Sequence, residues 1–349
     1  MSGTQGCWQR IACFLSAVGV GLTASCAGSP STVDPRGPHA ANAAEIWWVS
    51  FWLAAGVFAL VTALLAYALF RRRPDRLREP SAQMSAVWQH DAGARGPGQG
   101  FVVFGGIILP ILILVPLSAY WMLKLMDVAV PGTQPAFTIE VTGYQFWWHV
   151  RYPNHEFVTA NEIHIPVGQP VRLVVKSADV IHSFWVPQLM GKHDMIPGKA
   201  IETWIQADEA GVFWGECAEY CGVQHAKMAF VLVAEPPDQF RAWTEQQQRP
   251  AAESNDPLAR RGAQVFAQEC IACHAIKVGG QTVGGAAGPD LTHFGSRRTV
   301  GAGILPNIRG NVAGWVGNPQ AIKPGNNMPI IDLDADSLLA VVAYLESLK

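Results

Sequence analysis

The chain has 349 residues and a formal net charge of −2 at pH 7. A chain of this length is expected to hold two or three folding units. The near-neutral charge, with no basic run in the long C-terminal part, argues against a nucleic-acid-binding protein. Half of the residues are hydrophobic, and they are unevenly distributed along the chain. The positions of the apolar runs and of the cysteines are therefore more informative than the totals.

The first 26 residues have the pattern of an export signal. Arg10 precedes the apolar run of residues 11–24, and small residues follow it. Cys26, after "LTAS", is a candidate lipid-attachment residue, although Thr23 is an atypical residue three positions before such a cysteine. A plain cleaved signal and an uncleaved anchor are the alternatives.

Two apolar stretches are each long enough to cross the hydrocarbon core of a bilayer, and they predict helices at about 46–70 and 101–125. The segment "RRRPDRLREP", directly after the first stretch, carries five arginines against two acids. The positive-inside rule places this loop in the cytoplasm. The sequence therefore predicts a transmembrane hairpin over 40–126 in a bacterial inner membrane. Both termini and everything after about Met126 are expected on the periplasmic or outer side.

Residues 136–235 have the pattern of a β-domain. Short apolar or alternating runs are separated by turn residues such as "PVGQP" and "DEAG". Several strands at this spacing predict an all-β sandwich or barrel. The segment has six Lys and Arg against eleven Asp and Glu. Such an acidic surface either receives a basic partner or is simply solvated.

A short helix and a polar linker are expected over 236–255, followed by a second unit over 256–349 with helices at both ends. This unit contains "CIACH". Two thiols one helical turn apart reach the two vinyl groups of a haem, and the adjacent histidine coordinates the iron. Cys270 and Cys273 are therefore predicted to attach haem c, with His274 as an axial ligand. A thioredoxin-like redox pair is the alternative, but no βαβ unit accompanies it.

The second axial ligand should lie downstream. Met328, in "GNNMPI", is the only methionine after Met228 and sits in a loop that contains proline and glycine. A thioether ligand raises the iron potential, which suits electron transfer; His293 is the alternative ligand. Through "CIACH", "GPDLTHFGSRR" and "NNMP", the unit resembles a class I cytochrome c. The resemblance implies an all-α domain.

The stretch "GECAEYCGVQHAKM" carries the spacing C-x3-C-x3-H-x2-M. Structural zinc sites have no use for methionine, whereas thiolate, imidazole and thioether together favour copper. Mononuclear blue-copper loops carry one cysteine, and the second cysteine allows two thiolates to bridge two metals. Cys217, Cys221, His225 and Met228 are thus predicted copper ligands. A disulfide between the cysteines is the alternative in an oxidising compartment, but it leaves the histidine and methionine unexplained.

A binuclear site needs a further histidine from elsewhere in the β-domain. His182, in "SADVIHSFWVP", ends an apolar strand and is the best candidate. Four other histidines lie in strands or charged turns and are interpreted as non-ligands: His149, His155, His164 and His193.

The motifs "HSFWVP", "KHDMIPGK", "WGECAEYCGVQHAKM" and "VTGYQFWWHV" resemble those of cytochrome c oxidase subunit 2. The hairpin and the fused haem domain resemble the variety found in caa3-type oxidases. The resemblance implies a binuclear copper centre, Cu-A, in a cupredoxin fold. The family's ligands fall on His182, Cys217, Cys221, His225 and Met228.

The resemblance also implies two roles for Glu219, a backbone carbonyl on copper and a side chain on a magnesium ion shared with subunit 1. Many family members have tryptophan where this chain has Phe146, and that tryptophan receives electrons from soluble cytochrome c. Trp147 and Trp148 are alternative entry points, or they serve only in core packing. The run "GQGFVVFGGIILP" has no acidic residue, so no proton-uptake residue is predicted there.

The sequence thus predicts a multidomain membrane protein with a two-helix transmembrane hairpin, an all-β cupredoxin domain and an all-α class I cytochrome c domain. Its expected role is the electron-input subunit of a terminal oxidase. Cytochrome c or another donor delivers electrons, which pass through haem c and Cu-A to the haem of subunit 1. The partners are subunit 1, subunit 3 and the membrane, and oxygen reduction with proton pumping belongs to subunit 1.

Three other functions are weighed against this one. A copper storage or delivery module has no reason to carry "CIACH". The same electron-input role in a nitric oxide or nitrous oxide reductase is open, because the catalytic subunit selects the substrate. A peroxidase or gas sensor requires an open sixth position on the haem iron.

Overall fold

The computed structural model describes residues 30–71, 99–129, 131–251 and 253–349. The predicted export signal with Cys26, and the arginine-rich loop after Arg71, lie outside the described residues. The chain forms two compact units. Of the described residues, one unit comprises 45–71 and 99–129, and the other comprises 30–44, 131–251 and 253–349.

The first unit is helical and apolar. It contains α2 (Pro38–Phe70) from Glu45 onward, α4 (Gln99–Val103), a π-helical turn η1 (Phe104–Ile108) and α5 (Leu109–Ala129). The described chain has two helical stretches long and apolar enough to cross a membrane, Pro38–Phe70 and Gln99–Ala129, with mean hydropathies of 2.3 and 2.6. Their large apolar side chains are exposed, as is expected where lipid replaces water.

Helix α2 begins eight residues before the predicted start at 46. The added turns have the sequence "PHAANAAE", with proline at the helix start and four alanines. Proline is favoured at the first helical position, and alanine has the highest intrinsic helix propensity. Hydropathy alone misses these turns because they are short and contain polar residues.

The second unit contains a β-domain of two five-stranded sheets, whose strands lie between Thr138 and Glu235 and enclose its core. The first sheet has the order β3 (Phe157–Ala160), β2 (Trp147–Tyr152), β1 (Thr138–Tyr144), β5 (Val171–Ser177), β8 (Ile201–Ile205). The second has the order β4 (Glu162–Pro166), β10 (Ala229–Glu235), β9 (Gly211–Cys217), β6 (His182–Trp185), β7 (His193–Met195).

Alternating burial along strands β1 and β9 places every second side chain in the core. The core beneath the functional loop is aromatic. The Trp148 ring lies 6.0 Å from Phe184 and 5.2 Å from Phe230, centroid to centroid. Gly215 leaves the space that the Phe230 ring fills, because a Cβ at position 215 would lie 2.1 Å from that ring. This packing fixes the strands that carry the candidate ligands.

Helix α6 (Pro237–Gln248) leads from the β-domain to a C-terminal domain, residues 256–349. Its helices are α7 (Pro257–Glu269), α8 (Arg309–Gly317), α9 (Pro319–Ile322) and α10 (Ala335–Ser347). Two short hairpins are β11 (Ala275–Val278) with β12 (Gln281–Gly284), and β13 (Thr299–Val300) with β14 (Leu305–Pro306). Short 3-10 turns are η2 (Pro153–His155), η3 (His225–Lys227) and η4 (Phe294–Ser296).

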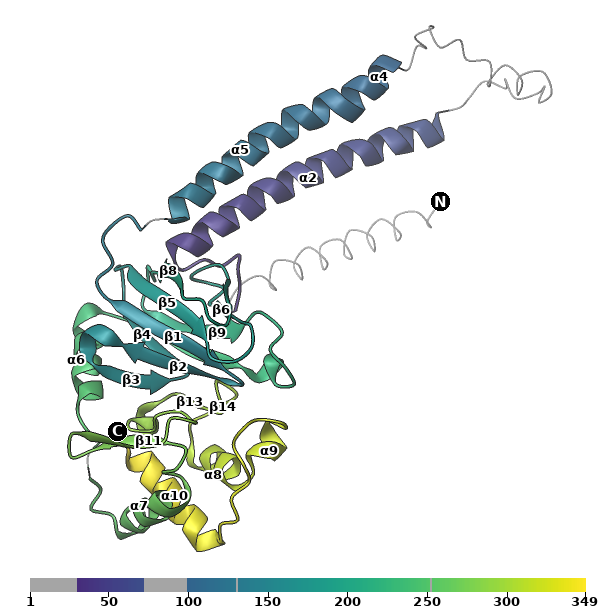
Figure 1. Cartoon of the computed structure of the whole chain (residues 1–349). Coiled ribbons are helices and arrows are strands. Elements are labelled where there is room, and N and C mark those ends of the chain that lie inside the picture. Colours follow the sequence, from purple (N-terminus) through teal and green to yellow (C-terminus); the bar gives the residue numbers. More distant parts are fainter. Residues whose placement is uncertain (1–29, 72–98, 130, 252) are drawn as a thin grey trace, which may run out of the picture. The chain divides into compact units, whose positions relative to one another are not determined.

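Helices α7 and α10 of the C-terminal domain pack closely (Figure 1), and Gly262 makes their approach possible. A Cβ at position 262 would lie 1.9 Å from the carbonyl oxygen of Ala340, which is backbone and cannot rotate away. The Phe266 and Tyr344 rings pack beside this contact at 5.5 Å.

Gly262→Ala is expected to lower the unfolding free energy of the C-terminal domain by about 3 kcal/mol, because the two helices must separate. Denaturant unfolding of the haem-loaded chain, followed by haem absorbance, measures this. Gly314→Ala is the control, since a Cβ there meets only the Ile322 side chain at 3.8 Å. Equal stability of the two variants would contradict the proposed close contact.

Candidate metal centres

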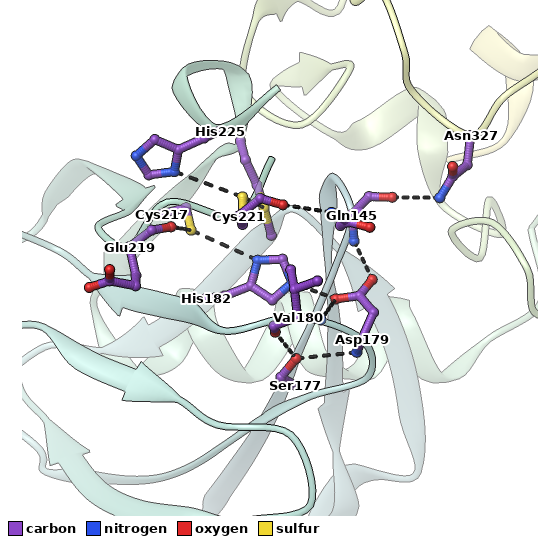
Figure 2. Close-up of polar contacts among 11 residues, drawn as sticks. Gln145, Ser177, Asp179, Val180, His182, Cys217, Glu219, Cys221, His225 and Asn327 are labelled. Atoms are coloured by element: carbon purple, nitrogen blue, oxygen red, sulfur yellow. Dashed lines mark hydrogen bonds and ion pairs between the residues drawn. The ribbon is translucent and has the colours of Figure 1, made fainter. Parts of the chain in front are cut away.

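Five of the predicted copper ligands gather in the structure at one end of the β-domain, and Figure 2 labels four of them, His182, Cys217, Cys221 and His225. Cys217 Sγ lies 3.8 Å from His182 Nδ1, and Cys221 Sγ lies 3.8 Å from His225 Nδ1. Met228 Sδ is 3.8 Å from Cys221 Sγ. The ligand atoms of His182, Cys217 and Cys221 all lie within 4.8 Å of one another.

Strand pairing explains how residues distant in sequence meet here. Strand β6 runs antiparallel to β9 with Phe184 opposite Cys217, which brings the start of β6 beside the end of β9. The loop after β9 is closed by the Cys217 amide, which donates to the Met228 carbonyl at 3.0 Å. Gly143 in β1 leaves room for the His182 ring, since a Cβ there would lie 2.9 Å from His182 Cδ2.

The two cysteines are free thiols whose ionisation is linked. The neighbouring Cys221 is the largest cause that lowers the pKa of Cys217, and His182 lowers it further against the opposing effect of burial. The same contact with Cys217 raises the pKa of Cys221. A metal cation supplies the positive charge that lets both thiols ionise together.

His182 is oriented by Asp179, a residue that the sequence analysis did not single out. His182 Nε2 lies 2.7 Å from Asp179 Oδ1, which leaves Nδ1 facing Cys217. The other carboxylate oxygen of Asp179 accepts a hydrogen bond of 2.7 Å from the backbone amide of Gln145. A carboxylate on the second nitrogen fixes both the tautomer and the direction of a metal-binding histidine.

Asp179→Ala is expected to weaken copper binding by about 10- to 100-fold, the usual effect of removing such a partner. A competition titration with a copper chelator measures the affinity. Asp208→Ala is the matched control, because Asp208 is exposed in the same domain and its carboxylate accepts from Gln206. If both variants bind copper as tightly as the unaltered chain, Asp179 does not support a copper-binding His182.

Glu219, between the cysteines, presents two different groups. Its carbonyl oxygen lies 3.2 Å from Cys217 Sγ, at the edge of the ligand cluster. Its carboxylate points away and pairs with Lys192 at 3.2 Å, at the surface of the domain. The donor set of two thiols, two imidazoles, a thioether and a carbonyl is soft, mostly buried and suited to copper.

The C-terminal domain presents residues that fit a covalent haem. The amides of Cys273 and His274 both donate to the Cys270 carbonyl, at 3.1 and 3.0 Å, and this turn holds the motif together. The Cys270 and Cys273 thiols are free. His274 Nδ1 lies 2.8 Å from the Pro289 carbonyl, so Nε2 is the nitrogen left for iron. Burial lowers the pKa of His274, which favours the neutral, ligating imidazole.

Met328 is half-buried in a loop held by side-chain hydrogen bonds. Its amide donates to Asn326 Oδ1 at 2.8 Å, and its carbonyl accepts from Gln320 Nε2 at 2.8 Å. The alternative ligand, His293, uses Nε2 to contact the Arg249 carbonyl at 3.0 Å.

The four histidines that were interpreted as non-ligands have structural contacts. His164 lies between Glu162 and Glu235, at 3.0 and 3.3 Å, and stacks on Trp243. The remaining three contact a ring or a hydroxyl group: His149 with Trp147, His155 with Phe137, and His193 with Thr203.

The three aromatic candidates for electron entry occupy different environments. Phe146 is buried, and its ring borders Gly222 of the copper-binding loop. Trp147 is half-buried and stacks on Tyr144 at 4.8 Å. Trp148 is fully buried in the aromatic core, as its packing interpretation anticipated.

The fold and the two ligand sets define a class of membrane-attached electron-transfer proteins, with a copper-binding β-domain and a haem-binding helical domain. A family model described as cytochrome c oxidase subunit II, periplasmic domain, matches residues 155–235. A model described as cytochrome c matches residues 259–349. These matches imply copper in the β-domain and haem c in the C-terminal domain.

Two curated relatives match nearly the whole chain. Cytochrome c oxidase subunit 2 of Alkalihalophilus pseudofirmus is 37% identical and covers 91% of each chain. Cytochrome c oxidase subunit 2 of Bacillus subtilis is 29% identical and covers 95% of each chain. The crystal structure of the periplasmic domain of subunit II of cytochrome oxidase from Bradyrhizobium japonicum is 34% identical over 33% of this chain and 95% of that chain, with a TM-score of 0.32. The chain belongs to the cytochrome c oxidase subunit 2 family.

Proposed function

We propose that this chain is the electron-input subunit of a terminal cytochrome c oxidase, working in a complex with subunits 1 and 3. The observation that supports this best is the gathering of two cysteines, two histidines and a methionine at one end of the β-domain, in a chain that also carries a haem-attachment motif. Electrons from cytochrome c or another donor enter at haem c and pass through copper to the haem of subunit 1. Oxygen reduction to water and proton pumping take place there.

The copper centre is proposed to be binuclear Cu-A. Cys217, Cys221, His182, His225, Met228 and the Glu219 carbonyl would hold it, and Nδ1 of each histidine faces a cysteine sulfur. In the C-terminal domain, Cys270 and Cys273 would hold haem c covalently, and His274 and Met328 would ligate its iron. The chemistry that these bound groups supply is reversible one-electron transfer, in which loss of an electron at one centre is matched by gain at the other.

The residues around the copper ligands favour transfer with little rearrangement. His182, Cys217, Cys221 and Met228 are all at most 5% exposed, so water is excluded from most of the ligand set. The closed loop and the contact from Asp179 to His182 hold the ligands in place before any metal binds. Preorganised ligands minimise the structural change that accompanies a change of charge.

Glu219 is proposed to have a second role at the interface with subunit 1. Its carboxylate is close to half exposed and is separated from the copper ligands, so it is available to a magnesium ion held jointly by the two subunits. Lys192 supplies the positive charge beside it in the isolated chain.

The topology proposed is a multi-pass protein of the bacterial inner membrane, with both termini and both metal-binding domains on the periplasmic side. The long apolar helices and the arginine-rich connection between them support this orientation.

The test is stopped-flow spectroscopy of the purified oxidase complex, mixed anaerobically with reduced cytochrome c. The haem of this chain should be reduced first, then copper, then the haem of subunit 1. Oxygen uptake should require the whole complex, because this chain alone holds no oxygen-reducing site in the proposal. Reduction of nitric oxide without reduction of oxygen would contradict the assignment to an oxidase.

A further inference from the structure

The C-terminal domain contacts the β-domain near the candidate copper site, through hydrogen bonds between residues far apart in sequence. Lys227 Nζ donates to the Ile322 carbonyl at 2.6 Å, and the Ala229 amide donates to the Ala302 carbonyl at 3.0 Å. Gln224 donates to the Pro324 carbonyl. All three β-domain partners lie on or next to the loop that carries His225 and Met228.

Lys323 makes a further hydrogen-bonded contact between the two domains, and its side chain is buried. It is only 2% exposed, and its Nζ donates to the Phe146 carbonyl at 2.7 Å and to the Gly301 carbonyl at 3.2 Å. A buried amine is retained only where it has hydrogen-bond partners, so this contact indicates a specific interface. It fixes the loop after α9 against the turn between β1 and β2.

One series of contacts in this interface runs from Asn327, the residue before the predicted haem ligand, to the backbone of a predicted copper ligand, Cys221 (Figure 2). Asn327, the residue before Met328, donates from Nδ2 to the Gln145 carbonyl at 2.8 Å. The side chain of Gln145 donates from Nε2 to the Cys221 carbonyl at 2.6 Å. The backbone next to Met328 is thus linked to the backbone of Cys221 by two hydrogen bonds and the side chains of Asn327 and Gln145.

Gln145 also contacts the second half of the copper site. Its backbone amide donates to Asp179 Oδ2, and Asp179 Oδ1 lies 2.7 Å from His182 Nε2. One residue therefore connects the Met328 loop, Cys221 and His182. Gly222 leaves the space for its side chain, since a Cβ there would lie 2.9 Å from Gln145 Nε2.

We propose that Asn327 and Gln145 form the bridge by which electrons pass from the haem-binding domain to the copper site, with Gln145 as the positioning residue. This rests on the proposed function, in which haem c is the donor and copper the acceptor. One electron lost on the haem side is gained on the copper side, and no atom or proton is transferred. Phe146, although its ring borders the copper loop, serves in this bridge only as the neighbour that anchors Lys323.

The test uses the full-length chain loaded with haem and copper. A photoexcited flavin reduces the haem in a laser flash, and the rate at which the haem is reoxidised by copper is recorded. Asn327→Ala is expected to slow this rate by about tenfold. Loss of one hydrogen bond weakens the docking of the C-terminal domain on the β-domain by about that factor. Asn327→Asp has the same shape but no donor, and it should slow transfer as well.

Asn311→Ala is the matched control and should keep the original rate. Its amide donates to the Pro306 carbonyl at 2.9 Å, within the C-terminal domain and away from the bridge. The haem spectrum of each variant shows whether Met328 remains a ligand.

Gln145→Met separates positioning from simple loss of structure. It should slow transfer and also alter the copper hyperfine splitting, whereas Asn327→Ala should leave that splitting unchanged. The double variant, Gln145→Met with Asn327→Ala, should be no slower than the slower single variant. Either substitution alone already interrupts the bridge, so the second has nothing further to remove. Independent structural effects would instead multiply.

The bridge is wrong, while the proposed function stands, if the unaltered chain transfers electrons and Asn327→Ala does so at the same rate. It is also wrong if the two losses of rate multiply in the double variant. Absence of any transfer from haem to copper in the unaltered chain would overturn the proposed function, and the bridge with it.

Discussion

The Cys221→Ser variant is expected to lose the binuclear copper site. A hydroxyl is a hard, weakly acidic ligand that does not replace a bridging thiolate on copper. Cys221 Sγ also lies 3.8 Å from both His225 Nδ1 and Met228 Sδ, so its loss removes the thiolate with which those residues would bind copper in the proposed site. Electron transfer from haem to the β-domain should fall by more than about 100-fold, since loss of a ligand exceeds the effect of losing its hydrogen-bond partner.

Metal analysis and copper magnetic resonance of the purified variant measure this, and the haem is the internal control. Cys270 and Cys273 lie in the other domain, so haem content should remain that of the unaltered chain. A variant that keeps its copper content and its hyperfine splitting would show that Cys221 is not a bridging ligand.

The Met328→His variant is expected to lower the reduction potential of the haem by on the order of 0.2 V, because imidazole stabilises ferric iron relative to a thioether. At 59 mV per tenfold for one electron, this changes the equilibrium between donor and haem by more than about a thousandfold. Cytochrome c should then no longer reduce the haem efficiently. Spectroelectrochemical titration of the full-length chain gives the potential directly.

His293→Ala is the control for this assignment. His293 already contacts the Arg249 carbonyl through Nε2, and its loss should leave the haem spectrum and potential unchanged. If His293→Ala changed the spectrum and Met328→His left the potential as it was, the two ligand roles would be reversed.

The fold class was predictable because each module has a local signal. The apolar stretches, the alternating β-runs and the terminal helices of the C-terminal domain all follow from short-range pattern, and the structure confirms this fold class. The short hairpins β11–β12 and β13–β14 were not anticipated in a domain expected to be all-α. Their strands are two to four residues long and carry too little alternation to be recognised.

Most of the candidate copper site was predictable because four of its residues share one loop. His182 was predicted as the end of an apolar strand, but this placement is wrong: His182 is the first residue of β6, because the preceding strand β5 already ends at Ser177. The structure still brings it to Cys217, and its role as a ligand stays a prediction. Asp179 carried a weak local signal, three residues before His182. Gln145 and Asn327 carried none, because their contact joins residues 182 positions apart.

The burial of Lys323 could not be predicted from the sequence either. A lysine in a polar loop is normally solvated, and no pattern in "AIKPGNN" distinguishes it. Only the packing of one domain on another buries it and directs its amine to the Phe146 carbonyl. Residues at domain interfaces are therefore the part of this site that required the structure.

The central claim is that one end of the β-domain holds two copper ions that share an electron. Electron paramagnetic resonance of the copper-loaded, full-length chain tests it most directly, with the haem signal recorded separately in a copper-free sample. The account predicts a mixed-valence spectrum in which hyperfine splitting is divided equally between two copper nuclei. A spectrum with splitting from a single copper nucleus, or failure to take up copper, would contradict it.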